Sequence, residues 1–217
     1  MSTNRPAVAV GISIAALLLV LFVLLAAMVM ATNGPLTIDH QIIALITPMR
    51  GSIAESPMKV ATYLCSWQVV VAGVMIVVAG FAARHRWRLV VLVLVAVVGD
   101  EIIVASLKAI IRRPRPDQLL AIMPAAGSSF PSGHTFICIA FYGLLACLAL
   151  RRARSSILRA SIMVGIAAAV FAVGMSRIYL GAHWPTDVAG SCLLGSAWVA
   201  LLLAVEQVIR PKANISA

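Results

Sequence analysis

The sequence predicts an all-α protein, a bundle of six transmembrane helices with a short interfacial helix between the first and second spans. Two observations lead to this fold class. Of the 217 residues, 62% are hydrophobic and only 11% are charged, whereas a soluble domain usually carries about 25% charged residues. The apolar residues also gather in long runs without strand-type alternation, so a bilayer is the expected environment of most of the chain.

Each predicted span is long enough to cross a bilayer, which takes about 20 mostly apolar residues in a helix. The first apolar run exceeds the ~7–15 residues of the apolar part of a signal peptide, so we interpret it as a retained helix. All spans belong to one predicted membrane domain over residues 1–217. The six spans are residues 7–31, 60–83, 89–111, 132–150, 157–175 and 186–208.

Residues 36–58, between the first two spans, are predicted to form the interfacial helix. Asp39, His40 and Arg50 interrupt the stretch, which is too short to cross a bilayer. Pro57 either ends this helix or begins the next element. The apolar positions recur at helical spacing; they are Ile38, Ile42, Ile43, Ile46 and Met49.

The net charge of +10 indicates a membrane orientation rather than a nucleic-acid partner, because no soluble basic domain remains outside the spans. With a cytoplasmic N-terminus, ten of the 17 Lys and Arg residues lie in cytoplasmic segments. The basic runs 84–88 and 151–159 are then positive-inside anchors rather than binding patches. We expect a multi-pass protein of the cell (inner or plasma) membrane with both termini in the cytoplasm.

The four cysteines are predicted to be buried thiols, because all of them fall in apolar stretches. They form no Cys-x-x-Cys pair and have no His partner at metal-ligand spacing, so no metal site is expected. A disulfide between two spans remains open. The cysteines are Cys65, Cys138, Cys147 and Cys192.

Five of the seven remaining cations crowd into two polar segments, 108–117 and 176–187, and a third polar segment covers 131–135. Segment 108–117 ends the third span, segment 131–135 begins the fourth, and segment 176–187 links the fifth to the sixth. In an up-and-down bundle, odd helices end and even helices begin on the same side. Parity alone therefore predicts that the three segments meet on one membrane face, outside the cytoplasm.

Together the segments have the composition of a phosphate site. Arg115 and Arg177 carry guanidinium groups that match phosphate oxygens, and Lys108 adds a third cation. Ser132 and Gly133 open a helix, whose N-terminus favours a phosphoryl group.

Two of the four histidines lie in these segments and predict catalysis. His183 precedes Asp187 by four residues, and Pro185 favours a helix start that puts Asp187 in the first turn. Asp187 is then placed to orient His183 as a nucleophile. His134 is the candidate general acid for the leaving oxygen.

The three segments resemble the signature of the type 2 phosphatidic acid phosphatase superfamily, which includes lipid phosphate phosphatases and vanadium haloperoxidases. That signature runs Lys, six residues, Arg-Pro; then Pro-Ser-Gly-His; then Ser-Arg, five residues, His, three residues, Asp. The resemblance implies a phosphohistidine nucleophile at His183, oriented by Asp187, with His134 as acid, no metal or other cofactor, and six membrane helices. The residues it assigns to phosphate are Lys108, Arg115, Ser132, Gly133 and Arg177.

The expected substrate is a lipid phosphate or diphosphate, with a polyprenyl diphosphate such as undecaprenyl diphosphate as the first choice and phosphatidylglycerol phosphate and phosphatidic acid as alternatives. A haloperoxidase is disfavoured because those enzymes are soluble. A lipid-binding or transport protein without catalysis is the alternative of another class, although binding alone needs no oriented nucleophile.

Two further sets of charges stay open. Arg112 and Arg113 contact either a second phosphate or lipid headgroups, or lie on solvated surface. Asp100 and Glu101 lie deep in the third span, where carboxylates are expensive. Glu101 shares a helix face with Lys108 and is predicted to support the active-site residues without contacting the substrate. The alternative is a neutral, hydrogen-bonded carboxyl in the core.

Overall fold

The computed structural model describes residues 5–32, 34–117 and 120–209, and helices are the only regular secondary structure in these ranges. Four single helices are long and apolar enough to cross a membrane: α1 (Arg5–Thr32), α5 (Trp87–Ile111), α8 (Ser156–Tyr179) and α9 (Pro185–Ile209). A fifth span, Gly133–Leu150, joins α6 (Gly133–Ile137) to α7 (Leu144–Leu150) through the π-helical segment Cys138–Gly143. The all-α prediction is confirmed.

The predicted second span, residues 60–83, is broken in the structure. Its place is taken by α3 (Glu55–Tyr63) and α4 (Trp67–Ala82), which meet at a bend of 44°. The break occurs because Ser66 adopts an extended conformation, with φ −67° and ψ 150°. The described chain therefore has five membrane-length helices, or six if the bent pair counts as one span.

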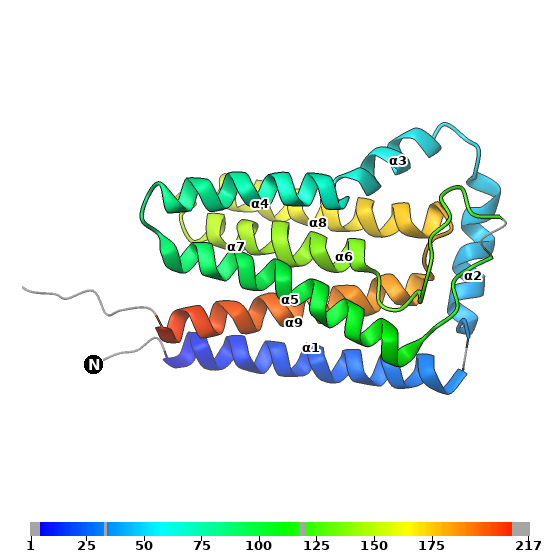
Figure 1. The fold of residues 1–217 in the computed structure, drawn as a ribbon, viewed down its shortest axis with the longest axis horizontal. Helices are drawn as coiled ribbons and strands as arrows, with labels where there is room; N and C mark the ends of the chain where they lie inside the picture. The colour runs from blue at the N-terminus through cyan, green and yellow to red at the C-terminus, as the bar shows by residue number, and fades with distance from the viewer. Residues whose placement is uncertain (1–4, 33, 118–119, 210–217) are drawn as a thin grey trace, which may run out of the picture.

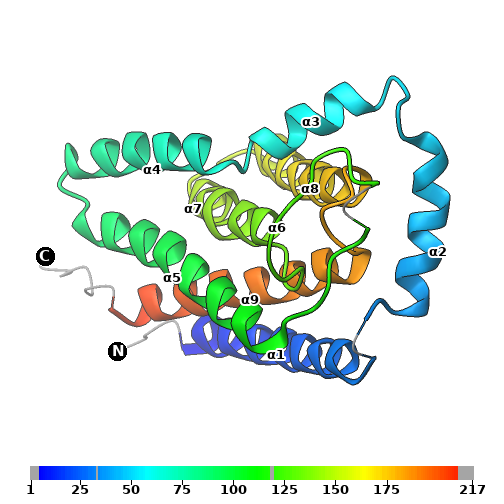
Figure 2. The same ribbon diagram turned by 45° about the vertical axis from the view of Figure 1, so that its right-hand side comes forward.

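The predicted short helix between the first two spans is confirmed as α2 (Thr37–Ile46), although it is shorter than residues 36–58. It is followed by the 3-10 turn Thr47–Met49, and Pro57 lies in the first turn of α3, so this proline begins the next element. α2 stands crosswise to the bundle at one end (Figures 1 and 2). It therefore covers the end at which α5 and α8 finish and α9 begins.

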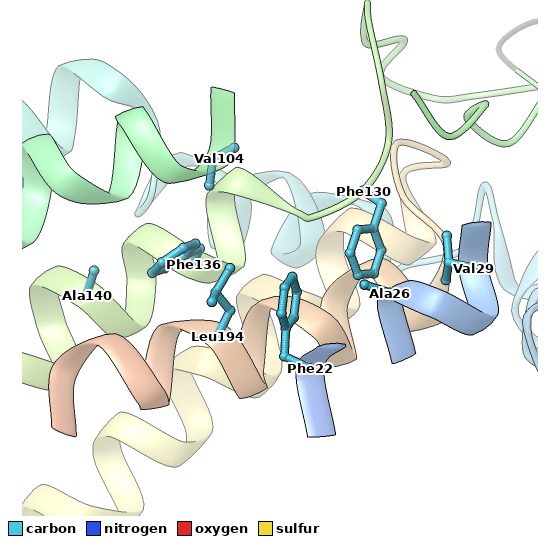
Figure 3. Close-up of a cluster of buried hydrophobic side chains, with 8 residues drawn as sticks. All are labelled: Phe22, Ala26, Val29, Val104, Phe130, Phe136, Ala140 and Leu194. Atoms are coloured by element: carbon cyan, nitrogen blue, oxygen red, sulfur yellow. The ribbon is translucent and has the colours of Figure 1, made fainter. Parts of the chain in front are cut away.

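Antiparallel packing of α1 along α9 runs the length of the bundle (Figure 1). Figure 3 shows the buried cluster at this contact, in which the ring of Phe22 from α1 stacks on Phe130 at 5.7 Å between centroids. Gly190 of α9 leaves room for Phe130, since a Cβ there would lie 2.7 Å from its ring. Phe130 is thus fixed immediately before residues 131–135, the third polar segment.

The cysteine prediction is only half correct. Cys65 and Cys138 are buried, whereas Cys147 and Cys192 are half-buried, and all four are free thiols. Cys147 and Cys192 are half-buried because the outer faces of the helices are also apolar, as exposed Ile76 and Phe171 illustrate. In a bilayer such faces need no protein cover.

Candidate active site

The three polar segments meet at the end of the bundle that carries α2 (Figure 1). The backbone N–H of Ser132 donates to the carbonyl of Asp187 at 3.3 Å. Arg115 Nη1 lies 3.4 Å from His183 Nε2. Segments 108–117 and 131–135 thus each lie within hydrogen-bond distance of segment 176–187, as the parity argument predicts.

His183 and Asp187 form the oriented pair that their spacing predicts. The imidazole Nδ1 lies 3.3 Å from Asp187 Oδ2, and the backbone N–H of Trp184 donates to the same oxygen at 2.8 Å. Pro185 begins α9, which places the carboxylate in its first turn. With Nδ1–H donating to Asp187, Nε2 keeps its lone pair and faces Arg115.

The turn that carries His183 depends on Gly181. Its φ of +79° is a conformation that other residues rarely adopt, and a Cβ there would lie 2.9 Å from the backbone of Ala121. The backbone N–H groups of Ala182 and His183 both donate to the carbonyl of Arg177, at 3.0 and 3.2 Å. The nucleophile candidate is therefore tied to the end of α8 that bears Arg177.

The Arg115 side chain is fixed in the site by hydrogen bonds to backbone carbonyls. Its Nε and both terminal nitrogens donate to backbone carbonyls, including Ala126, Ser128 and Ala182. Burial lowers the pKa of Arg115, and the charge of Asp187 opposes that effect. These contacts fix a cation beside His183 Nε2.

Arg177 offers an unused donor in the same place. It is only 6% exposed, and its Nη1 donates to the hydroxyl of Thr62 at 2.7 Å. Its buried Nε has no hydrogen-bond partner within the described part of the chain. Leaving a buried guanidinium N–H without a partner costs free energy. The Nε of Arg177 therefore indicates a position where an anion would bind.

Lys108, Ser132, Gly133 and His134 complete the predicted set. Lys108 lies in the last turn of α5, and its charge interacts with those of Arg115, Arg177 and Asp187. Ser132 is buried at the start of α6, where its hydroxyl accepts from Thr135 at 3.2 Å. Half-buried Gly133 and His134 follow it, and the charge of His134 interacts with that of His183.

The protonation state of His183 suits a nucleophile. Burial lowers its pKa to about 4, although the hydrogen bond to Asp187 and the charge of Asp187 oppose that shift. The cations Arg115 and Arg177 lower the pKa further. His183 is therefore neutral across the physiological pH range.

We expect kcat/KM to rise with pH as His183 loses its proton through its pKa of about 4. We expect the profile of kcat to be bell-shaped, because kcat reports groups in the substrate complex. There the negative charge of the bound phosphoryl group favours protonated His134, and kcat should fall at the higher pH at which His134 loses that proton. Initial rates of phosphate release in detergent, measured between about pH 3 and 9, check this. A steady rise across that range, with the chemical step limiting, would contradict the assigned acid.

Residues 87–210 match the family model described as the PAP2 superfamily, which is more than half of the chain. The chain belongs to the PAP2 superfamily. It is 32% identical over 180 residues to phosphatidylglycerophosphatase B of Bacillus subtilis, covering 82% of this chain and 87% of that protein. It is also 33% identical over 118 residues to a lipid A 1-phosphatase of Rhizobium johnstonii, covering 50% and 44%, respectively.

A solved PAP2 structure supports the same assignment. The crystal structure of a transmembrane PAP2-type phosphatidylglycerolphosphate phosphatase from Bacillus subtilis matches with a TM-score of 0.80 and 26% identity. The match covers 90% of this chain and 97% of the other. The protein is accordingly a multi-pass membrane phosphatase of the PAP2 superfamily.

One residue of this PAP2 site was missed from the sequence. Arg113 is 2% exposed and donates to Asp187 Oδ1 at 2.5 Å and to Asp39 Oδ2 at 2.6 Å. Both interpretations given above, a second phosphate or headgroup contact and solvated surface, are wrong for Arg113. Its neighbour Arg112 is exposed and donates to the carbonyl of Ala109 in its own helix.

The two carboxylates deep in α5 differ in their surroundings. Asp100 is 3% exposed, and its Oδ1 has no hydrogen-bond partner among the residues that the structure describes. Glu101 is exposed, although its charge interacts with that of Lys108. The support of the active site by Glu101 stays a prediction, and Asp100 is the carboxylate that the protein buries.

An apolar groove of about 610 Å³ begins beside the PAP2 site. Ile178 at the end of α8 and Pro185 at the start of α9 line it, and it continues along both helices past Val170 and Cys192. One lining residue, Pro185, is thus two positions after His183 in the sequence, and the groove extends from there toward the middle of the spans.

Proposed function

We propose that the protein hydrolyses a membrane lipid phosphate or diphosphate through a phosphohistidine at His183. The observation that carries this proposal is the geometry of the His183 ring. Asp187 holds Nδ1, while Nε2 faces the cation of Arg115. A neutral imidazole so oriented has its lone pair directed to the place where the cations attract a phosphoryl group.

The first step transfers the phosphoryl group to His183. Nε2 attacks phosphorus in line, the N–P bond forms, and the bond to the lipid oxygen breaks as His134 gives that oxygen its proton. The second step returns the enzyme to its starting state. His134 takes a proton from water, the oxygen attacks phosphorus, and the N–P bond breaks to release phosphate.

Cations stabilise the charge on the three equatorial oxygens in both steps. The unpaired Nε of Arg177 is a direct donor for one oxygen. Lys108, Ser132 and the N-terminus of the span that begins at Gly133 are the candidate donors for the others. Because Arg115 already donates to several carbonyls, we assign it mainly to electrostatic stabilisation beside His183.

Two substrates lead the candidates. The membrane-integral type of site agrees with a polyprenyl diphosphate such as undecaprenyl diphosphate. Phosphatidylglycerol phosphate is supported by the similarity to phosphatidylglycerophosphatase B of Bacillus subtilis and to the crystal structure of a phosphatidylglycerolphosphate phosphatase from that organism. Phosphatidic acid remains an alternative, and in each case the headgroup reaches the site while the tail stays among the helices.

The site is assigned to the extracytoplasmic face of the cell membrane. Support comes from the positive-inside distribution of Lys and Arg. The helices agree with it, because α1 begins and α9 ends at the end of the bundle opposite the site (Figure 1). Both termini would then be cytoplasmic.

The decisive experiment is phosphate release from a panel of lipid phosphates by purified protein in detergent with EDTA present. The panel contains undecaprenyl diphosphate, phosphatidylglycerol phosphate and phosphatidic acid. We expect release from at least one of them, with the highest kcat/KM defining the substrate, and none from His183→Ala. Binding of these lipids without release would support a non-catalytic binding or transport protein instead.

We expect the apolar groove to hold the lipid tail. Filling it by Ala167→Trp on α8 should lower kcat/KM for a long-chain lipid phosphate at least about tenfold, because a displaced tail misaligns the headgroup. Turnover of a water-soluble aryl phosphate should not change. Ala168→Trp, on the same helix but outside the groove lining, is the matched control. Equal losses on both substrates would contradict a tail site.

A further inference from the structure

A buried network joins α2 to the oriented pair of the active site. Arg113 donates through Nη1 to Asp187 Oδ1 at 2.5 Å and to the hydroxyl of Thr186 at 2.8 Å. Through Nη2 it donates to Asp39 Oδ2 at 2.6 Å. Its Nε and Nη2 also donate to the carbonyl of Gly34, both at 3.3 Å. Arg113 thereby links three segments that are far apart in the sequence.

Asp39 closes the network on the other side. Its Oδ1 accepts from the backbone N–H of Thr186 at 2.9 Å, and the hydroxyl of Thr186 lies 2.8–2.9 Å from both carboxylate oxygens. Its Oδ2 also accepts from the backbone N–H of Leu36 at 2.9 Å. Asp39 therefore holds both the cation that binds Asp187 and the first turn of α9.

We infer that Asp39 and Arg113 are positioning residues, which fix the Asp187 carboxylate so that it orients His183 for attack on phosphorus. This inference rests on the function proposed above. Asp187 Oδ1 is held by Arg113, so only Oδ2 faces the imidazole. The backbone N–H of Trp184 holds Oδ2 in turn. Both oxygens of the carboxylate are therefore held by protein donors, with Oδ2 directed at Nδ1.

The charges of the network also fit the proposed reaction. Asp39 and Asp187 together carry one negative charge more than Arg113 neutralises. When His183 becomes a phosphohistidine with Nδ1 protonated, its ring gains positive charge, which this excess carboxylate charge stabilises. A phosphate-binding role for Arg113 is disfavoured, since its side chain is 1% exposed and its guanidinium is engaged by protein oxygens.

Stability alone is a weak reason to bury such a network. Removing three charged groups from water costs free energy that their attraction roughly offsets, and well-packed apolar residues often serve as well. All three groups are almost completely buried: the side chains of Asp39 and Asp187 are 0% exposed. Their placement directly behind the nucleophile indicates a role in orientation.

The other charges around His183 come from four elements: Lys108 from α5, Arg115 from the following loop, His134 from α6 and Arg177 from α8. We expect these groups to stay in place when the network is altered. A change in the pH profile of an Asp39 or Arg113 variant therefore shows that the network acts on His183 through Asp187.

Steady-state kinetics of purified variants on the best lipid substrate of the panel test the inference. Arg113→Lys, which keeps one charge but cannot bridge two carboxylates, and Asp39→Asn should each lower kcat about 10-fold to 100-fold. KM should stay within about twofold, because neither side chain touches the substrate. Asp39→Glu should recover part of the loss that Asp39→Asn causes.

Arg113→Gln adds a pH readout. Loss of the cation leaves Asp187 more negative, so the pKa of His183 rises and the acid limb of kcat/KM moves to higher pH. Matched controls are Arg112→Gln, next in the chain but exposed, and Glu55→Gln, whose carboxylate pairs with Lys59 on its own helix. Both should retain wild-type kcat and the wild-type acid limb.

Thermal unfolding in detergent shows which variants remain folded. Folded Asp39→Asn and Arg113→Lys with wild-type kcat would overturn the inference, as would a rise in KM without a fall in kcat, which indicates substrate binding by Arg113. If Arg113→Gln does not fold, the Asp39→Asn and Arg113→Lys kinetics decide alone. Failure of the proposed function itself is recognised separately, because the wild-type protein would then release no phosphate.

Discussion

Replacing His183 by alanine should lower kcat for lipid phosphate hydrolysis by at least about 10⁴-fold, because a reaction that proceeds through a covalent intermediate loses its main route with its nucleophile. The imidazole is fixed by Asp187 and faces Arg115, and no other described histidine shares this arrangement. Phosphate release in detergent with EDTA present measures the loss. A residual rate is expected from the cations, which still bind and polarise the phosphoryl group.

The same variant tests for the covalent intermediate. A phosphoramidate bond is stable in base and labile in acid, so labelled substrate quenched in base should leave label on the wild-type protein and none on His183→Ala. His85→Asn is the matched control. His85 is exposed in the turn between α4 and α5, and asparagine tolerates its φ of 52°. Retention of more than about a tenth of the activity by His183→Ala would exclude the assigned nucleophile.

Most of the membrane fold could be predicted from the sequence, because hydrocarbon imposes a simple requirement on composition and length. Apolar runs of bilayer length became α1, α5, α8, α9 and the span Gly133–Leu150. The break between α3 and α4 could not be seen in this way. The run 60–83 is apolar as a whole although Ser66 and Gln68 interrupt it, and the break depends on backbone torsion angles that hydropathy does not encode.

The convergence of the three polar segments was also predictable, since helix parity needs only the order of the spans. The roles of individual residues depended on the spacing of the polar residues and on the family resemblance. Arg113 was missed because it lies beside Arg115 in a run of similar residues. What separates the two is three-dimensional: Arg113 faces Asp39, 74 residues away in the sequence.

A signal for Asp39 was nevertheless present. Asp39, Ile42, Ile43 and Ile46 are spaced at three, four and seven residues, so they share one face of α2. A carboxylate on an otherwise apolar face needs a buried partner. The sequence could therefore have predicted that Asp39 pairs inside the protein, but the choice among 17 Lys and Arg residues needed the folded structure.

Replacing His134 by alanine should have a large effect that depends on the leaving group. With a lipid phosphate, whose alkoxide or phosphate leaving group needs a proton, kcat should fall about 10²-fold to 10⁴-fold. With an aryl phosphate whose phenolate leaves without protonation, the first step should slow less than about tenfold. The side chain lies where both steps need it, half-buried at the start of α6 and electrostatically coupled to His183.

The second step separates an acid–base role from a binding role. Because His134 also activates the water, the His134→Ala protein should accumulate as the phosphohistidine form when it is given the aryl substrate. A stopped-flow trace should then show a burst of about one phenolate per protein, followed by slow turnover. His183→Ala should show no burst. A different role follows if kcat of His134→Ala falls equally on lipid and aryl substrates and no burst appears. His134 then binds the phosphoryl group rather than moving protons, and the leaving oxygen must obtain its proton from another group.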